Sequence, residues 1–290
     1  MNGFGLQTPA RPNNSCSPLQ RARQAFTLVE LLVVITIIGI LLALLVPTIG
    51  SVLNTANDAQ MGIEISQIAK SLEAYRVDQG AYPPDFVSGP KDDQAQMNTH
   101  LARKFRYRNV QADVIATPGL DPAEALVFWL SGFGGNDRAP LTSRESVSPE
   151  WQNFRGAKPY YPFDQTRLQD KDGDGWPEYY PDGSEMPFIY VRADSYGVKN
   201  GETYQPNELK ALNGNVVFKA YASQMTGAQI KRFAEHEKYQ VICAGQDGQF
   251  GAGLGQPTSA VYPDGLLYAE ADEDNITNFS EGKTLEDMIP

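Results

Sequence analysis

Aspartates at alternating positions form the clearest chemical pattern in the chain. The stretch DKDGDGWPE carries Asp170, Asp172 and Asp174, a glycine turn, and then Glu178. Carboxylate oxygens two residues apart can curl around one Ca²⁺, and this spacing matches the first nine positions of an EF-hand-type loop. The last position of such a loop should supply a bidentate glutamate, but it is Pro181 here. The pattern predicts a calcium loop, with a solvated Asp-Gly turn as the alternative.

Residues that could act as nucleophiles or bases have no suitable neighbours in the sequence. His100 and His236 are the only histidines, and neither lies at a metal-ligand spacing from a second ligand. Cys243 lies in an apolar stretch that indicates a strand, so we expect a small core residue. The glycine-rich residues 251–255 lead to Pro257 instead of a helix, which does not fit dinucleotide binding. We therefore expect a protein that is not an enzyme.

A lone carboxylate, Glu30, lies inside the apolar run of residues 26–49. As an α-helix this run would be ~36 Å long, enough to cross the hydrocarbon core of a membrane. Arg21 and Arg23 precede it and a long acidic segment follows, so the positive-inside rule places the N-terminus in the cytoplasm. No Lys, Arg or His occurs between Arg23 and Lys70, so no basic side chain of this segment can pair with Glu30.

Three interpretations of this run differ in the role that they give Glu30. A cleaved signal peptide has an apolar region of about 7–15 residues, which is shorter than this one. A plain membrane anchor would hold a carboxylate in the bilayer at a cost of about 3 kcal/mol and give it no role. Cleavage between Ala25 and Phe26 would instead create an α-amine four residues before Glu30. If such helices pack with a stagger, the amine of one chain could meet the carboxylate of another, and Glu30 would set the register of an assembly.

The stretch AFTLVELLVV, with the two arginines upstream, resembles the processing site of type IV prepilins and type II secretion pseudopilins. The resemblance implies that prepilin peptidase cuts before Phe26 and methylates the new amine, and that Glu30 serves assembly. It also implies a break or melted section of the helix at Pro47, in agreement with the missing N–H of proline. Ala25 departs from the glycine that usually precedes the cut in this family.

The pattern after Pro47 predicts that the helix continues as an amphipathic one. Apolar residues recur at mostly three- and four-residue steps: Val52, Ala56, Ala59, Ile63, Ile68, Leu72 and Tyr75. Gly80 is a suitable C-cap, and Pro83 and Pro84 prevent continuation. The stretch IAKSLEAYRVDQGAYPPD that ends this helix is similar to the corresponding segment of the protein G class of major pseudopilins.

These patterns predict an α+β, pilin-like fold, in which a long N-terminal helix packs on a small antiparallel sheet with inserted loops. Residues 1–25 should be a cleaved leader, 26–49 the membrane-spanning helix, and 50–80 its continuation. The rest, 81–290, should be a periplasmic head with insertions at 85–160 and 198–235. Within the head we expect a short helix over 121–135 and strands within 186–197 and 239–244.

A second calcium site is implied by the resemblance, in the C-terminal loop of the head. The family binds Ca²⁺ there through acids and backbone carbonyls, and the matching positions are Asp247, Asp272 and Asp274. Residues 251–270 lengthen this loop, so the match is looser. Removal of the leader would remove Cys16 and leave Cys243 alone, so a metal clip could replace a disulfide outside the cell.

The charge of the chain limits its partners. The net charge is −11, and removal of residues 1–25 takes away three arginines and no acid, which gives −14. A chain this acidic is repelled by phosphate backbones, so we expect no nucleic-acid binding. The basic cluster RKFRYR at 103–108 is interpreted as a local ion-pairing or subunit-contact surface.

The sequence therefore predicts a structural subunit of a pilus-like filament of a type II secretion system. The expected partners are further pseudopilin subunits, prepilin peptidase, the inner-membrane assembly platform and the lipid bilayer. The expected location is the bacterial inner membrane as a single-pass protein with a periplasmic head, and then a periplasmic filament. The alternatives are a type IV pilin for adhesion, motility or DNA uptake, and a membrane-anchored binding or catalytic domain. Pilins of that type often have a C-terminal disulfide, whose absence here favours the pseudopilin.

Overall fold

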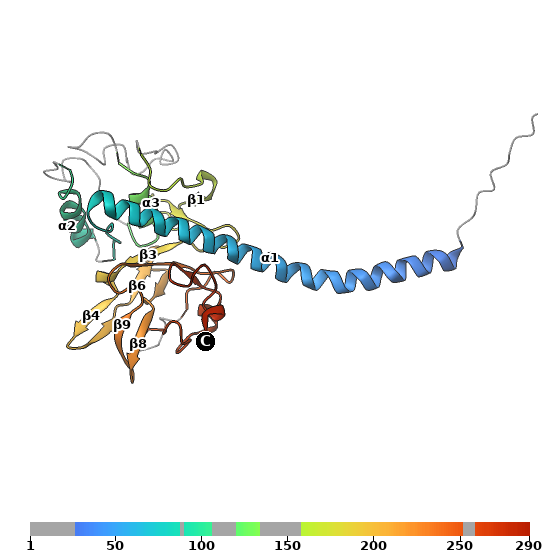
Figure 1. The fold of residues 1–290 in the computed structure, drawn as a ribbon. Helices are drawn as coiled ribbons and strands as arrows, with labels where there is room; N and C mark the ends of the chain where they lie inside the picture. Colours follow the sequence, from blue (N-terminus) through green and yellow to red (C-terminus); the bar gives the residue numbers. More distant parts are fainter. Residues whose placement is uncertain (1–26, 88–89, 106–119, 134–157, 252–258) are drawn as a thin grey trace, which may run out of the picture. The chain divides into compact units, whose positions relative to one another are not determined.

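The chain divides into two compact units, residues 1–50 and residues 51–290 (Figure 1). The computed structural model describes residues 27–87, 90–105, 120–133, 158–251 and 259–290. Ala25 and Phe26, at the predicted processing site, lie outside the described residues, as does much of the predicted insertion at 85–160. The predicted α+β class is confirmed, because a long helix precedes a set of antiparallel strands.

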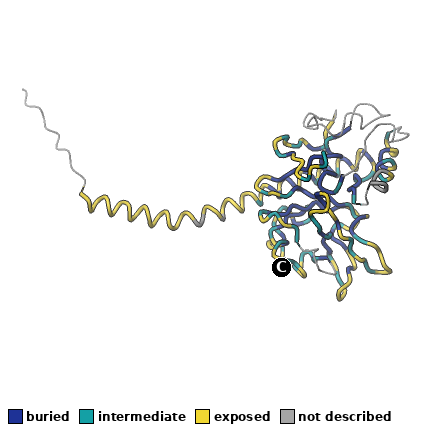
Figure 2. The backbone as a smooth tube through the Cα atoms, turned by 180° about the vertical axis from the view of Figure 1, so that it is seen from behind, coloured by how far each residue is buried: buried dark blue, intermediate teal, exposed yellow. Residues whose placement is uncertain are grey.

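Helix α1 (Leu28–Gln79) begins with the apolar run and supplies the described part of the first unit. Its segment Leu28–Val46 has a mean hydropathy of 3.0 over 19 residues, long and apolar enough to cross a membrane. The residues of this segment are exposed, as the colour of the tube in Figure 2 indicates. The resemblance implies a break at Pro47, but in this structure the helix runs through Pro47 without interruption.

The later part of α1 is the central element of the second unit. Five side chains on one stripe are almost completely buried: Met61, Ile65, Ile68, Leu72 and Tyr75. The predicted stripe is confirmed from Ile68 to Tyr75 but is wrong before it, because Val52 and Ile63 are exposed. The buried residues Met61, Ile65 and Ile68 are separated by four and three residues, which is the period of one helix face. The predicted stripe instead stepped five residues from Ile63 to Ile68, which leaves that face.

The predicted end of α1 is confirmed at Gly80, which has a φ of +81° and donates its N–H to the Arg76 carbonyl at 2.8 Å. A left-handed residue of this kind is a common helix C-cap and favours glycine. The two prolines that follow are held by buried rings. Trp129 Nε1 donates to the Pro84 carbonyl at 2.9 Å, and the Tyr190 hydroxyl donates to the Pro83 carbonyl at 2.8 Å. These bonds join the end of α1 to the head.

Short elements complete the α part of the second unit. The expected helix at 121–135 is found as α3, in which every residue is buried. The elements are α2 (Pro90–Leu101), α3 (Ala125–Leu130), η3 (Gln165–Arg167), η4 (Ala193–Ser195), α4 (Glu270–Glu273) and η5 (Glu286–Met288).

The strands form small sheets in which every paired neighbour is antiparallel. The expected strands are confirmed as β3 (Ile189–Arg192) and β10 (Tyr239–Cys243), which pair in the three-stranded order β11-β10-β3 with β11 (Ile276–Thr277). A four-stranded sheet has the order β4-β5-β9-β8, from β4 (Gly197–Asn200), β5 (Thr203–Pro206), β8 (Ala222–Thr226) and β9 (Gln229–Phe233). Two hairpins pair β1 (Leu168–Gln169) with β2 (Glu178–Tyr179) and β6 (Leu209–Ala211) with β7 (Val216–Phe218).

The three-stranded sheet separates two hydrophobic cores. Alternate residues of a strand point to opposite faces. Tyr239, Val241 and Cys243 of β10 belong to the core that contains the α1 stripe, whereas Ile242 belongs to the second core. The second core is closed mainly by the strands of residues 198–235. The predicted insertion is therefore a structured layer with a core of its own, which no sequence pattern indicated.

A backbone contact joins α1 to the C-terminal part of the chain. Gly62 is buried, and a Cβ atom on it would lie 2.2 Å from the carbonyl oxygen of Gly282. Gly282 itself has a φ of +78°, a conformation that favours glycine. The pair therefore depends on the absence of two side chains.

Replacement of Gly62 by alanine should lower the melting temperature of the chain. In an ordinary helix this change stabilises by about 1 kcal/mol. Here the new methyl group must displace the backbone of residue 282, and overpacking of this kind costs about 1–3 kcal/mol. The measurement is thermal unfolding of the full chain in detergent, followed by the fluorescence of the buried tryptophans. Gln60→Ala, at an exposed position of the same helix, is the control, and a rise in melting temperature for Gly62→Ala would contradict the contact.

Candidate functional site

The first turn of α1 holds the carboxylate of Glu30 by a reciprocal capping arrangement. The Thr27 N–H and the Thr27 hydroxyl both donate to Glu30 Oε2 at 2.8 Å. In return the Glu30 N–H donates to Thr27 Oγ1 at 3.2 Å. This is the capping box, whose signature is Thr or Ser followed three residues later by Glu. The sequence TLVE carries that signature, so the local role of Glu30 could have been found from it.

The capping box gives Glu30 neutral donors from its own chain. Within residues 27–50 no basic side chain occurs, as the sequence indicates. The role of Glu30 in assembly, with Phe26 and Pro47, stays a prediction. In this structure Thr27 is the donor to one oxygen of that carboxylate, Oε2.

The predicted calcium loop folds as a set of tight turns. Asp170 accepts the N–H groups of Gly173 and Gly175, at 2.8 and 3.1 Å. Asp172 Oδ1 accepts the Asp174 N–H at 3.3 Å. Both glycines have positive φ, +79° and +96°. The carboxylate oxygens of Asp170, Asp172 and Asp174 come within 4.8 Å of one another.

Glu178 closes the same loop from β2. It is completely buried, and its Oε2 accepts the Lys171 N–H at 3.2 Å. Burial, with a smaller contribution from neighbouring aspartates, raises the pKa of Glu178 to about 8 and that of Asp174 to about 7. The loop therefore concentrates carboxyl groups in surroundings that disfavour their charged form.

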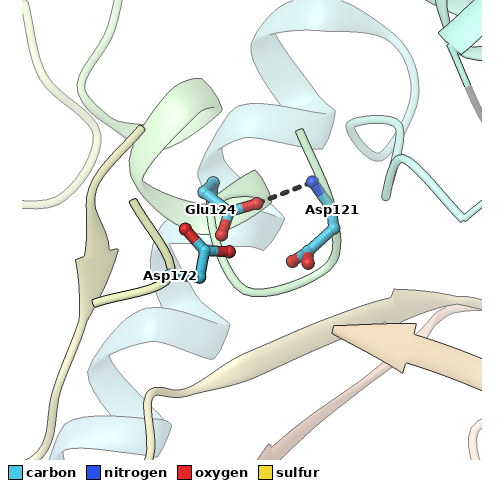
Figure 3. Close-up of side chains that lie close together, drawn as sticks. All are labelled: Asp121, Glu124 and Asp172. Atoms are coloured by element: carbon cyan, nitrogen blue, oxygen red, sulfur yellow. Dashed lines mark hydrogen bonds between the residues drawn. The ribbon is translucent and has the colours of Figure 1, made fainter. Parts of the chain in front are cut away.

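Two acids that no sequence pattern marks as ligands lie beside this loop. Figure 3 shows the carboxylates of Glu124 and Asp172 directed toward one another, with Asp121 next to them. One oxygen of each of these three residues lies within 4.8 Å of the others. Glu124 Oε2 accepts the Asp121 N–H at 2.6 Å, which fixes the side chain at the start of α3. The sequence indicates Asp121 only as a helix-opening residue, because its proximity to the loop arises from tertiary structure.

The acids of the predicted C-terminal site are engaged in hydrogen bonds within the head. Asp272 accepts the Tyr221 hydroxyl at 2.7 Å and the Ala269 N–H at 2.8 Å. Asp274 Oδ2 accepts the N–H groups of Gln246 and Asp247, at 2.7 and 2.9 Å. The structure thus brings Asp247 and Asp274 together. Among the described residues, the clusters of three carboxylates within 4.8 Å lie at the aspartate loop and beside it, and neither includes Asp247, Asp272 or Asp274. The C-terminal metal site therefore stays a prediction.

Glu64 of α1 is a buried acid that lies off the predicted apolar stripe. It lies 2.6 Å from Arg167 Nη2 and accepts the hydroxyls of Tyr179 and Tyr161, at 2.7 and 3.1 Å. The Arg167 guanidinium also lies over the Tyr179 ring, 4.5 Å from its centre. Only 5% of Glu64 is exposed. This network attaches η3, which ends at Arg167, and Tyr179 of β2 to α1.

His100 and Cys243 are both buried in the interior of the head. His100 is buried, with Nε2 2.8 Å from the Tyr75 hydroxyl oxygen, and burial lowers its pKa to about 3. Cys243 is a core residue, as predicted, and burial raises the pKa of its thiol to about 12. A thiol with so high a pKa is a poor nucleophile at neutral pH.

Part of the predicted basic cluster pairs locally. Lys104 Nζ lies 2.5 Å from Asp78 Oδ1, and the interaction lowers the pKa of Asp78. This agrees with the ion-pairing interpretation for Lys104. Residues 106–108 of the cluster lie outside the described residues.

Comparisons with known proteins converge on the N-terminal segment. Residues 20–46 match the family described as prokaryotic N-terminal methylation motif. The chain is 42% identical over 66 residues to the type II secretion system core protein G of Pseudomonas aeruginosa, covering 22% of this chain and 46% of that protein. It is 39% identical over 62 residues to the type IV wide pilus major component PilA4 of Thermus thermophilus, covering 21% and 47%.

The matches cover less than half the length of these relatives. No solved structure matches the chain. The predicted resemblance is confirmed for the N-terminal segment, which is homologous to segments of both relatives.

Neutralisation of Glu64 by Glu64→Gln should destabilise the fold by about 2 kcal/mol. The change removes a charge-assisted bond and leaves the partly buried Arg167 without its counter-ion. The measurement is urea unfolding of the full chain in detergent. The matched control is Asp194→Asn, which breaks an ion pair whose acid side chain is 74% exposed and should cost at most about 1 kcal/mol. Equal effects of the two changes would contradict the role of burial.

The buried His100 should make the fold lose stability as the pH falls below 6.5. The folded chain keeps His100 neutral down to about pH 3, whereas the unfolded chain takes up a proton near the ordinary pKa of 6.5. The contribution of neutral His100 to the free energy of unfolding is therefore fully present above pH 6.5. Below that pH it falls by up to about 1.4 kcal/mol per pH unit. Unfolding free energies measured from pH 7 to 5 should fall less steeply for His100→Gln. His236→Gln, which removes a partly exposed imidazole, is the matched control variant. An unchanged slope for His100→Gln would count against a neutral His100.

Proposed function

Because the chain has a type IV pilin-like N-terminus, we propose that it is a structural subunit of a pilus-like filament, assembled through helix α1. The observation that carries the proposal is the match of residues 20–46 to the methylation motif, on a helix whose apolar side chains are exposed. The exposed apolar surface of Leu28–Val46 requires lipid or other helices around it. In the proposal, the membrane covers this surface before assembly and neighbouring subunits cover it afterwards.

In this proposal the leader is removed between Ala25 and Phe26 by prepilin peptidase, and the new amine is methylated. The amine and Glu30 then lie four residues apart, at one end of an apolar helix. The carboxylate accepts the amine of a neighbouring subunit in place of the Thr27 donors, and the pair sets the stagger between chains. The inner-membrane assembly platform and like subunits are the proposed partners, and the head is placed in the periplasm.

The proposed system is type II secretion, with a role as pseudopilin. The similarity to a secretion core protein supports it, and so does the single buried Cys243 of the head, which excludes an intramolecular disulfide in a processed chain. The similarity to a wide-pilus component makes a type IV pilin the second candidate. Both candidates use α1 in the same way and give the chain no catalytic role.

The processed chain should start at an N-methylated Phe26, and Glu30 should be needed only after processing. Intact mass and N-terminal sequencing of the protein from its own membranes test the first point. Glu30→Gln keeps the shape of the side chain but removes its charge, so it should be processed normally and enter filaments at least about tenfold less. Filament entry is measured by the sheared or crosslinked fraction relative to the membrane fraction.

Thr27→Val is the matched variant for this experiment. It removes the capping hydroxyl but leaves the carboxylate, so it should lower helix stability slightly and still assemble. A chain that begins at Met1, or normal assembly of Glu30→Gln, would contradict the proposal. Loss of exported enzymes without loss of surface pili, on deletion of the gene, distinguishes the secretion role from the pilus role.

A further inference from the structure

We propose that the head binds one Ca²⁺ between the turn that opens α3 and the aspartate loop, held by Glu124 and Asp172 with Asp121 beside them (Figure 3). The site differs from the loop site predicted from sequence, because its central ligand, Glu124, comes from a different element. It does not depend on filament assembly, since it lies in the second unit and can be measured on single chains in detergent.

The first observation is a set of buried oxygens that lack hydrogen-bond donors. Glu124 is completely buried; its Oε2 accepts the Asp121 N–H, but its Oε1 has no hydrogen-bond partner in the structure. Asp172 repeats the arrangement, with Oδ1 bonded to the Asp174 N–H and Oδ2 buried without a partner. A buried acceptor left without a donor costs about 1–3 kcal/mol or more when charged. In each carboxylate, one oxygen therefore positions the side chain and the other is available to bind a cation.

The second observation is the distance between these oxygens. Glu124, Asp172 and Asp121 each offer a carboxylate oxygen within 4.8 Å of the other two. Oxygens this close can all contact one ion, because Ca²⁺ binds oxygen at about 2.3–2.6 Å. Ca²⁺ is the expected ion because its coordination tolerates irregular geometry, whereas Mg²⁺ demands a near-ideal octahedron and keeps several of its waters.

The third observation is the absence of compensating charge within the described ranges. None of the ion pairs between described residues includes Glu124, Asp172, Asp121, Asp170 or Asp174. The nearby Lys171 directs its ammonium group to the Glu185 carbonyl and the Tyr180 ring. Buried carboxylates at such distances repel one another unless a proton or a cation lies between them. A divalent cation fulfils this requirement and uses the free oxygens.

The site also resolves the incomplete loop pattern. An EF-hand-type loop closes its coordination with a glutamate at the twelfth position, which is Pro181 here. Glu124, in the turn that opens α3, could supply the missing glutamate ligand. It lies beside Asp172, which belongs to both carboxylate clusters. The ion would thus join the α3 turn to the loop before β2, as a clip between two distant segments of the chain.

The test is calcium binding by the full chain in detergent after treatment with EDTA, measured by titration calorimetry with CaCl₂ and by melting temperature. Calcium at a concentration 100-fold above its dissociation constant should raise the melting temperature by roughly 5 °C or more. Glu124→Gln should weaken binding at least about tenfold. In EDTA the same variant should melt at the wild-type temperature or above it, because it removes a buried repelling charge. Magnesium chloride should give a smaller shift than calcium.

Two control variants separate this site from calcium binding elsewhere on the chain. Glu237→Gln, whose side chain is 83% exposed, should change nothing, and Asp274→Asn tests the predicted C-terminal site. If Glu124→Gln does not fold, Asp172→Asn serves in its place. The proposal is overturned if millimolar calcium causes no shift, if only Asp274→Asn removes the shift, or if magnesium equals calcium. It is also overturned if Glu124→Gln lowers the melting temperature in EDTA and keeps the calcium shift.

Discussion

The fold of the head depends on one apolar stripe of α1, from Met61 to Tyr75. The first core packs on this stripe, and the three-stranded sheet packs on that core. The close approach of Gly62 to Gly282 and the ion pair of Glu64 with Arg167 lie on the same stretch of helix. Most helical stability in proteins comes from the packing of an apolar face, so the head and the outer half of α1, which belong to one compact unit, stabilise each other.

The two halves of α1 differ in what covers their apolar side chains. Almost all side chains from Leu28 to Val46 are apolar, and they are exposed, so they need a non-aqueous environment. The apolar stripe from Met61 to Tyr75 is buried by the chain itself. A protein that supplies the cover for only half of its helix depends on lipid or on other subunits for the rest, which is the physical basis of the proposed filament.

Sequence patterns predicted the elements that rest on local rules. The limits of α1 follow from the apolar run and the Gly80 cap, and β3 and β10 follow from their apolar composition. Features that depend on distant contacts were not predictable. Glu64 looks like a surface acid until Arg167 is placed beside it, and Glu124 has no link in sequence to Asp172. The layer formed by residues 198–235 has short strands with mixed polarity, which give no clear period.

The capping box at Thr27 has a consequence for the energetics of assembly. In the proposed filament, a neighbour's amine would meet a carboxylate whose Oε2 already accepts two hydrogen bonds from Thr27. If the amine takes the place of these donors, docking at this point is an exchange of partners, and its net free energy is only the difference between the two arrangements. Such a contact would select the stagger while leaving each subunit removable, and the cohesion of the filament would come from the many apolar contacts along the helices. Subunits could then return to the bilayer without a large barrier at the acid.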